Sequence, residues 1–338
     1  MRILSVQNMA QIVQKHGFDN FMKDLVEYIR QDFIRWNEFD KSPRYAAHVP
    51  GGVLELMPTA DNKLFTYKCV NGHPANPFDG KQTVVAIGQV NEIKYGYPLL
   101  ISEMTLLTAL RTAAATILAT DYLARKDSKT MALIGTGAQS EFQTLAHKLI
   151  RPIETVKYFD IDPQAMEKYA KNMKNVDLNF IACNSAKEAC DGADIIVVCT
   201  ACKKHVVVIE NDWVKDGVHI NGLGGDCPGK TELDMKTLFR GKVVVEYKEQ
   251  SMIEGEIQNL SPQEVEQVLH AELWEILTGL KKGRENDKEI TIYDSVGFAV
   301  EDFSALRLTL DLADKYNIGS QIDMVPPIKD PKDLFSVI

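Results

Sequence analysis

Hydrophobic and polar positions divide the chain into a helical beginning, a strand-rich stretch and a long region in which strands and helices alternate. In the first of these, large apolar residues recur at close to four-residue spacing. The stripe consists of Phe21, Leu25, Ile29, Phe33 and Trp36. This spacing predicts helix within residues 8–40, with one face directed toward a core.

The strand-rich stretch contains two apolar segments, residues 53–57 and 64–70, separated by turn residues at 58–62. They predict an antiparallel pair. Glu55 and Lys68 each project from the face opposite their immediate neighbours, because side chains alternate along a strand. A charge in such a strand lies either on a solvated face or in a functional site, and the pattern allows both.

A loop at 71–77 and further strand material at 82–95 precede one long helix predicted at 103–125. This helix is rich in leucine, alanine and threonine, yet it carries Arg111 in its middle. A cation in such surroundings needs a partner or water. Because the helix leads into the alternating region, we predict a domain boundary near residues 111–112.

The alternating region opens with a unit that fits a dinucleotide. An apolar strand at 131–134 runs into Gly135-Thr136-Gly137-Ala138-Gln139-Ser140, a helix follows to about residue 149, and a strand at 155–159 delivers Asp160. Gly135 permits a tight turn, Gly137 lets the backbone approach a pyrophosphate, and the helix start offers free N–H groups to phosphates. Ser140, at the third glycine position, is small enough for close packing.

Asp160 follows the first glycine at close to the expected spacing of about 20 residues. A carboxylate there accepts hydrogen bonds from ribose hydroxyls and repels a 2′-phosphate. The unit therefore predicts a site for NAD in preference to NADP.

Beyond Asp160 the alternation continues with strongly β-branched runs. Further strands are predicted at 178–181, 194–199, 218–221, 243–246 and 290–294. Such runs, separated by helices, indicate a parallel sheet covered on both faces. A last helix, about 299–316, is expected to return to the first domain. The fold class is thus α/β: a Rossmann-type doubly wound parallel sheet domain at 113–304, and an α+β domain formed by 1–112 with 305–338.

Composition narrows the class of protein. The 338 residues suffice for two domains, and apolar and charged contents of 45% and 25% are those of an ordinary globular protein. A net charge of −9 argues against nucleic acid and anionic membranes as partners. With no signal peptide and no apolar run long enough for a membrane span, we expect a cytoplasmic protein.

Six cysteines spread over the chain are expected to be reduced thiols. Cys199 and Cys202 have C-x-x-C spacing, but the pair follows a late strand and has no second pair, so we expect packing near the cofactor instead of redox or metal chemistry. The histidines show no ligand spacing, and no metal is predicted.

The segment after the strand at 218–221 lies where ligands bind in an open parallel sheet. It reads Gly222-Leu223-Gly224-Gly225-Asp226-Cys227-Pro228-Gly229-Lys230-Thr231-Glu232-Leu233. Thr231 with Asp234 is expected to cap the next helix. Asp226 is not needed for that cap, so it is either a turn residue or a general acid or base beside the nicotinamide.

Five motifs together carry a family resemblance. They are Glu55-Leu56-Met57-Pro58, Lys68-x-Val70-Asn71-Gly72-His73-Pro74, Ala109-Leu110-Arg111-Thr112-Ala113-Ala114, Gly135-x-Gly137-Ala138-Gln139-Ser140-Glu141-Phe142 and the glycine segment 222–233. Their combination resembles the ornithine cyclodeaminase and mu-crystallin family, which also contains alanine dehydrogenases and ketimine reductases. The glycine segment is more similar to the cyclodeaminase branch.

The resemblance implies a homodimer, an NAD cofactor and a first domain that supplies both the dimer contact and the substrate site. Substrate-binding residues on matching positions would be Arg44, Met57, Lys68 and Arg111, with the three cations on the α-carboxylate of the amino acid. Asp226 and Glu55 would be catalytic and face the amino groups. Cofactor-binding residues would be Thr83, Thr112, Gly135, Gly137, Ala138, Gln139, Asp160 and Thr200.

The implied reaction converts L-ornithine to L-proline and ammonia. Hydride would pass from Cα to NAD, the δ-amine would attack the resulting imine, ammonia would leave, and the cyclic imine would take the hydride back. An NAD-dependent amino-acid dehydrogenase or ketimine reductase, a cyclodeaminase for lysine or another diamino acid, and a binding protein without catalysis remain as alternatives.

Overall fold

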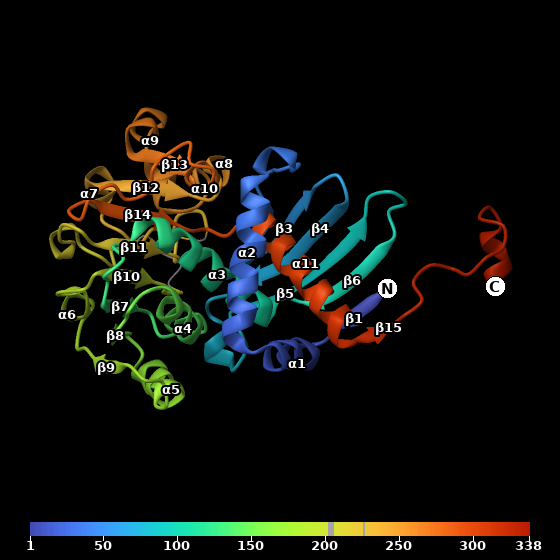
Figure 1. The fold of residues 1–338 in the computed structure, drawn as a ribbon, viewed down its shortest axis with the longest axis horizontal. Helices are drawn as coiled ribbons and strands as arrows, with labels where there is room; N and C mark the ends of the chain where they lie inside the picture. Colours follow the sequence, from blue (N-terminus) through green and yellow to red (C-terminus); the bar gives the residue numbers. More distant parts are fainter. Residues whose placement is uncertain (202–205, 226) are drawn as a thin grey trace.

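The computed structural model describes residues 1–201, 206–225 and 227–338 and contains two sheets joined by a layer of helices (Figure 1). The first sheet is mixed. Its strands, in spatial order, are β15 (Ser320–Gln321), β1 (Arg2–Leu4), β6 (Pro98–Glu103), β5 (Val84–Glu92), β4 (Leu64–Gly72), β3 (Gly52–Ala60) and β2 (Tyr45–Val49). Only the β1–β6 pair is parallel.

All pairs of the second sheet are parallel, as predicted for a doubly wound domain. Its order is β13 (Leu269–Glu272), β12 (Gly241–Val245), β14 (Ile290–Asp294), β11 (His219–Gly222), β10 (Ile195–Val198), β7 (Thr130–Ile134), β8 (Thr155–Phe159) and β9 (Asn179–Ala182). The order reverses between β7 and β10. Ligands of such sheets bind beyond the strand ends at this switch point.

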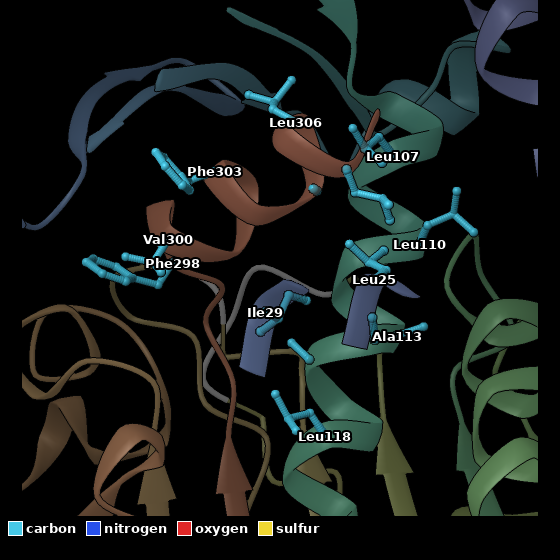
Figure 2. Packing of buried hydrophobic residues seen from close by; sticks show 14 of the residues in the cluster. Leu25, Ile29, Leu107, Leu110, Ala113, Leu118, Phe298, Val300, Phe303 and Leu306 are labelled. Atoms are coloured by element: carbon cyan, nitrogen blue, oxygen red, sulfur yellow. The ribbon is translucent and has the colours of Figure 1, made fainter. Parts of the chain in front are cut away.

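Three helices form the layer between the sheets: α2 (Phe18–Ile34), α3 (Thr105–Leu123) and α11 (Ala299–Tyr316). Helix α11 packs on β3, β4 and β5, whereas α3 contacts strands of both sheets. Figure 2 shows their apolar side chains meeting in one cluster, with Leu25 and Ile29 from α2, Leu110 from α3 and Phe303 from α11. Burial of this cluster fixes both sheets relative to one another.

The remaining helices surround these layers. They are α1 (Val6–His16), α4 (Ser140–Ile150), α5 (Pro163–Met173), α6 (Ala186–Cys190), α7 (Met235–Arg240), α8 (Lys248–Ser251), α9 (Pro262–Val268) and α10 (Leu273–Leu277), with 3-10 turns at Trp36–Glu38, Asn76–Asp79, Asn211–Trp213, Glu256–Asn259 and Leu334–Val337. None of the helices in the described ranges has the length and hydropathy needed to cross a bilayer.

Two local predictions were wrong. The helix predicted within 8–40 is divided into α1 and α2, because Gly17 adopts a φ of 83° and ends the first helix. The apolar stripe lies after this break, with its first four residues in α2 and Trp36 in the 3-10 turn that follows, and all five residues are buried. Pro58 is a strand residue opposite Tyr67 and not part of a turn. The sheet tolerates it because β2 begins at Tyr45, opposite Leu56, and requires no N–H from Pro58.

The chain passes between the two sheets along helices. Residue 112 lies inside α3 and residue 305 lies inside α11, so both predicted domain limits fall within continuous helices. The division into 1–112 with 305–338 and 113–304 stays a prediction.

The inner face of the first sheet carries two charged residues among its apolar ones, whereas leucines lie exposed on the outer face. Glu55 and Lys68 are 7% and 1% exposed, whereas Leu54 and Leu56, beside Glu55, are 45% and 39% exposed. The alternation predicted from the sequence is therefore present, and the charges lie on the face that packs against α11. Burying ionic groups while exposing leucines is costly unless both faces serve a purpose.

Candidate active site

The predicted dinucleotide turn lies at the switch point between β7 and β10. Gly135 has a φ of 96°, and a Cβ there would lie 2.7 Å from the carbonyl oxygen of Cys199, so only glycine fits. The Cys199 thiol donates to the Gly135 carbonyl at 3.2 Å. Cys199 therefore packs beside the turn, and Cys202 lies outside the described residues.

The start of α4 remains open to a ligand. A Cβ on Gly137 would meet no protein atom within 4 Å. Gln139, the N-cap residue of α4, makes no side-chain capping bond, and Ser140 is fully buried, with its hydroxyl donating to the Gly137 carbonyl at 2.7 Å. Open space beside free N–H groups is the geometry that accepts a phosphate.

Asp160 directly follows β8 and is tied to the same turn. One oxygen, Oδ2, accepts from the Thr136 N–H at 2.6 Å, and the other accepts from the Asp162 N–H at 3.0 Å. The acid predicted to bind ribose thus also holds the backbone between the two glycines. Asp162 in turn caps α5 by accepting from the Gln164 N–H.

The other residues predicted to contact the cofactor come from three places. Thr112 lies in mid-α3 and Thr83 lies in the loop before β5, where its carbonyl accepts from the His73 N–H at 2.8 Å. Thr200 follows β10, beside the turn, and its hydroxyl donates to Glu232. Buried Lys230 donates to the Thr200 carbonyl at 2.8 Å, so the loop after β10 is tied to the glycine segment.

Two of the cations predicted to bind substrate meet a pair of acids on α11. The Lys68 ammonium lies 2.9 Å from a carboxylate oxygen of Asp302. Arg111 donates to Glu301 at 2.6 Å, and its Nε lies 3.0 Å from Asp302. All four side chains are buried, so α11 supplies the partners that a cation within α3 was expected to need.

The third cation, Arg44, lies just before β2 and reaches across to the end of β14. Its Nη1 donates to Glu55 at 3.2 Å and its Nη2 donates to the carbonyls of Val296 and Gly297 at 2.8 and 2.6 Å. Its Nε lies 3.4 Å from Glu254. Met57, 2% exposed, shares the inner face of β3 with Glu55.

Burial perturbs the protonation of this cluster. Burial and the neighbouring Arg111 lower the pKa of Lys68 to about 8, and burial raises the pKa of Glu301 to about 8. Asp302 lies between two cations, Lys68 and Arg111. Perturbed groups gathered in this way are typical of functional sites.

Glu55 retains an unused acceptor. Its Oε2 accepts from Arg44, but within the described part of the chain Oε1 is buried and has no hydrogen-bond partner. A buried carboxylate oxygen left without a donor is costly, which indicates that a ligand donor completes it.

Asp226 lies outside the described residues, but its flanks are fixed. The Gly225 carbonyl accepts from the Gly255 N–H at 2.6 Å, and the Cys227 carbonyl accepts from the Lys230 N–H at 3.2 Å.

The residue predicted to cap the next helix was wrong. Asp234, not Thr231, caps α7 by accepting from the Lys236 N–H at 2.9 Å. The backbone after Thr231 is held by a different side chain, buried Glu256, which accepts from the Glu232 and Leu233 N–H groups.

Sequence reasoning missed the acids that neutralise the site. Glu301 and Asp302 stand side by side in the buried first half of α11, and Glu246 ends the β-branched run Val243-Val244-Val245. Charges inside apolar segments were the available signal, the same signal that had singled out Glu55, Lys68 and Arg111.

The fold and these clusters define a two-domain, nucleotide-binding enzyme that converts amino acids. The chain belongs to the ornithine cyclodeaminase/mu-crystallin family, whose sequence model matches residues 6–316. It is 48% identical to the ornithine cyclodeaminase of Agrobacterium fabrum, over 99% of this chain and 94% of the relative.

Solved structures agree with this assignment. The Thermococcus litoralis Δ1-pyrroline-2-carboxylate reductase, in complex with NADH and L-proline, superposes with a TM-score of 0.89 at 33% identity, covering 95% of this chain and all of that chain. A lysine cyclodeaminase that recognises L-lysine, L-ornithine and L-2,4-diaminobutyric acid gives a TM-score of 0.90 at 29% identity, covering 98% of each chain.

Proposed function

We propose that this protein is an ornithine cyclodeaminase, which converts L-ornithine to L-proline and ammonia with NAD as a catalytic cofactor. The observation that carries the proposal is the 48% identity to the Agrobacterium fabrum cyclodeaminase over 99% of the chain. The buried cluster of three cations with an incomplete acid supports an amino-acid substrate, because it offers complementary charge to both ends of such a molecule.

The nucleotide side of the site fits NAD. Gly135, Gly137, Ala138 and Gln139 would hold the pyrophosphate at the open start of α4, and Asp160 would hold the adenosine ribose. Thr83, Thr112 and Thr200 would complete the cofactor site. When bound, NAD supplies the oxidation of the substrate Cα and the later reduction of the ring.

The residues of this chain orient the substrate and move protons. Arg44, Lys68 and Arg111 would bind the α-carboxylate, which places Cα at a fixed position, and Met57 would line the same pocket. Oε1 of Glu55 would accept from a substrate amino group, since it has no donor among the described residues. Asp226 would take the proton from the δ-amine and so make it a nucleophile.

Incubation with L-ornithine and a substoichiometric amount of NAD tests the function. We expect proline and ammonia in amounts far above the NAD present, with no lasting NADH absorbance, because the ring forms within one bound substrate. A dehydrogenase would instead accumulate NADH one-for-one with an oxo acid and stop, and that stoichiometry would reject the proposal.

Two controls sharpen this assay. L-Lysine in place of L-ornithine tests the chain length of the substrate. Faster conversion of lysine than of ornithine would make lysine the substrate instead. NADP in place of NAD is expected to support far less conversion, because the Asp160 carboxylate would face the 2′-phosphate. Equal conversion with both cofactors would contradict the role given to Asp160.

The homodimer belongs to the same proposal and is supported by the outer face of the first sheet. Tyr45, Leu56, Cys69 and Ile87 lie side by side on four adjacent strands, β2 to β5. All four are exposed, and Leu54, Phe65 and Val85 enlarge the patch. Contiguous apolar surface of this kind is typical of an interface between subunits.

Leu56→Lys is expected to convert the dimer to a monomer, because it places a charge at the centre of this face. The matched control is Ile181→Lys on β9, which is 38% exposed, close to the 39% of Leu56, but lies on the other sheet. Sedimentation velocity measures the outcome. A monomeric native protein, or equal effects of both substitutions, would contradict this interface.

A further inference from the structure

The carboxylate of Glu246 organises the end of β14 from the end of β12. Glu246 follows β12 directly, is fully buried, and faces the segment 295–297 that follows β14. It accepts from the Ser295 hydroxyl at 2.6 Å, from the Val296 N–H at 3.1 Å and from the Gly297 N–H at 3.3 Å. One side chain thus uses the donors of three successive residues. The Tyr293 hydroxyl, at 3.1 Å, is a further donor to it.

The other side of the same segment holds Arg44. The carbonyls of Val296 and Gly297 accept from Nη2 of this arginine at 2.8 and 2.6 Å. The N–H groups of these two residues therefore face Glu246 while their carbonyls face Arg44. A displacement of the segment would move both acceptors of Nη2 together.

The segment also sets the position of Arg111. Gly297 has a φ of 77°, and a Cβ there would lie 2.6 Å from Nη1 and 2.8 Å from Nη2 of Arg111. The guanidinium therefore lies directly against the glycine backbone. Only glycine at this position gives both the backbone conformation and the space.

We infer that Glu246 is a positioning residue for substrate: by fixing the segment 295–297 it places the guanidinium groups of Arg44 and Arg111, which bind the amino-acid carboxylate. The inference rests on the proposed function, because that is what assigns the carboxylate to these arginines. Glu246 contacts the N–H groups of this segment, whereas Arg44 contacts its carbonyls. Glu246 consequently acts on binding geometry and not on proton transfer.

Two substitutions test the segment, one in the side chain that holds it and one in the segment itself. Glu246→Gln keeps the shape of the side chain but turns one acceptor into a donor that faces the donors of the segment. Gly297→Ala leaves Glu246 intact and presses a methyl group against the Arg111 guanidinium. We expect both to raise the KM for L-ornithine about tenfold or more, with kcat changed by less than about threefold.

A matched control separates contact from backbone strain. Gly279 has a φ of 78°, and a Cβ there would meet nothing within 4 Å. Gly279→Ala therefore imposes similar strain on the backbone without touching the site, and its KM for L-ornithine is expected to equal that of the native protein. The dissociation constant for NAD, measured by fluorescence titration, is expected to be unchanged in all three variants.

The outcomes distinguish failure of the role of Glu246 from failure of the proposed function. The native protein is assayed first, and absence of proline formation from L-ornithine there would reject both. With an active native protein, an unchanged KM in folded Glu246→Gln and Gly297→Ala would overturn the role of Glu246 alone. So would a parallel change of KM, kcat and NAD affinity, since that pattern reports general loosening of the fold. If Glu246→Gln does not fold, Gly297→Ala with its control decides.

Discussion

Arg111→Met is expected to lower the free energy of unfolding by about 3–5 kcal/mol, the usual cost of removing one partner from a buried ion pair. Arg111 is 5% exposed, and it contacts two fully buried acids, Glu301 at 2.6 Å and Asp302 at 3.0 Å. Without the guanidinium, Lys68 is the one charged partner that Asp302 keeps among the described residues. Urea denaturation followed by circular dichroism measures the loss.

A matched arginine tests whether the buried acids are the cause. Arg2 is 8% exposed, but its partner Asp314 has a side chain that is 62% exposed and is solvated with or without the arginine. Arg2→Met is therefore expected to cost about 1 kcal/mol. Adding Glu301→Gln to Arg111→Met should recover part of the loss, because one buried acid is then removed. Equal losses in both single variants, or no recovery, would contradict this explanation.

The dinucleotide unit could be predicted because its determinants are local in sequence. Gly135 needs a left-handed backbone and the absence of a Cβ, Asp160 ends the next strand, and both follow from a strand–turn–helix–strand pattern within about 30 residues. The all-parallel sheet was predicted for a similar reason, since continuous β-branched runs are buried on both faces. No long-range information was needed for either.

The partners of the substrate-binding cations could not be placed in this way. Lys68 and Asp302 are 234 positions apart, and Arg111 and Glu301 are 190 apart. Periodicity identifies a charge in an apolar segment but does not show which distant charge neutralises it. Only the packing of α11 on β3 and β4, with α3 alongside, brings the two sets together.

Local backbone conformations also could not be predicted from the hydrophobic pattern. Buried apolar residues occur at helical spacing on both sides of Gly17, so periodicity alone gives no sign that the φ of 83° there separates two helices. The direction of the charges in the first sheet is a different case. Glu55 and Lys68 were recognised as unusual, but alternation is symmetric, and only burial beneath α11 decides that the charges face inward.

Asp226→Asn is expected to lower turnover of L-ornithine by about 10² or more, the usual contribution of a positioned acid or base, while NAD binding and the melting temperature stay unchanged. The substitution keeps the size of the side chain and removes its ability to take a proton. The flanking backbone is held independently of this side chain, by the Gly255 N–H on the Gly225 carbonyl and the Lys230 N–H on the Cys227 carbonyl. Loss of turnover would then report chemistry and not a collapsed loop.

The same change at Asp234 provides the control. Asp234 follows the glycine segment and caps α7 by accepting from the Lys236 N–H at 2.9 Å. Asparagine is an equally good N-cap, so Asp234→Asn should retain both stability and turnover. Steady-state rates of proline formation, with NAD affinity from fluorescence titration, measure both variants. Native turnover in folded Asp226→Asn would make Asp226 a turn residue, and Oε1 of Glu55 would then be the expected acceptor for the substrate amine.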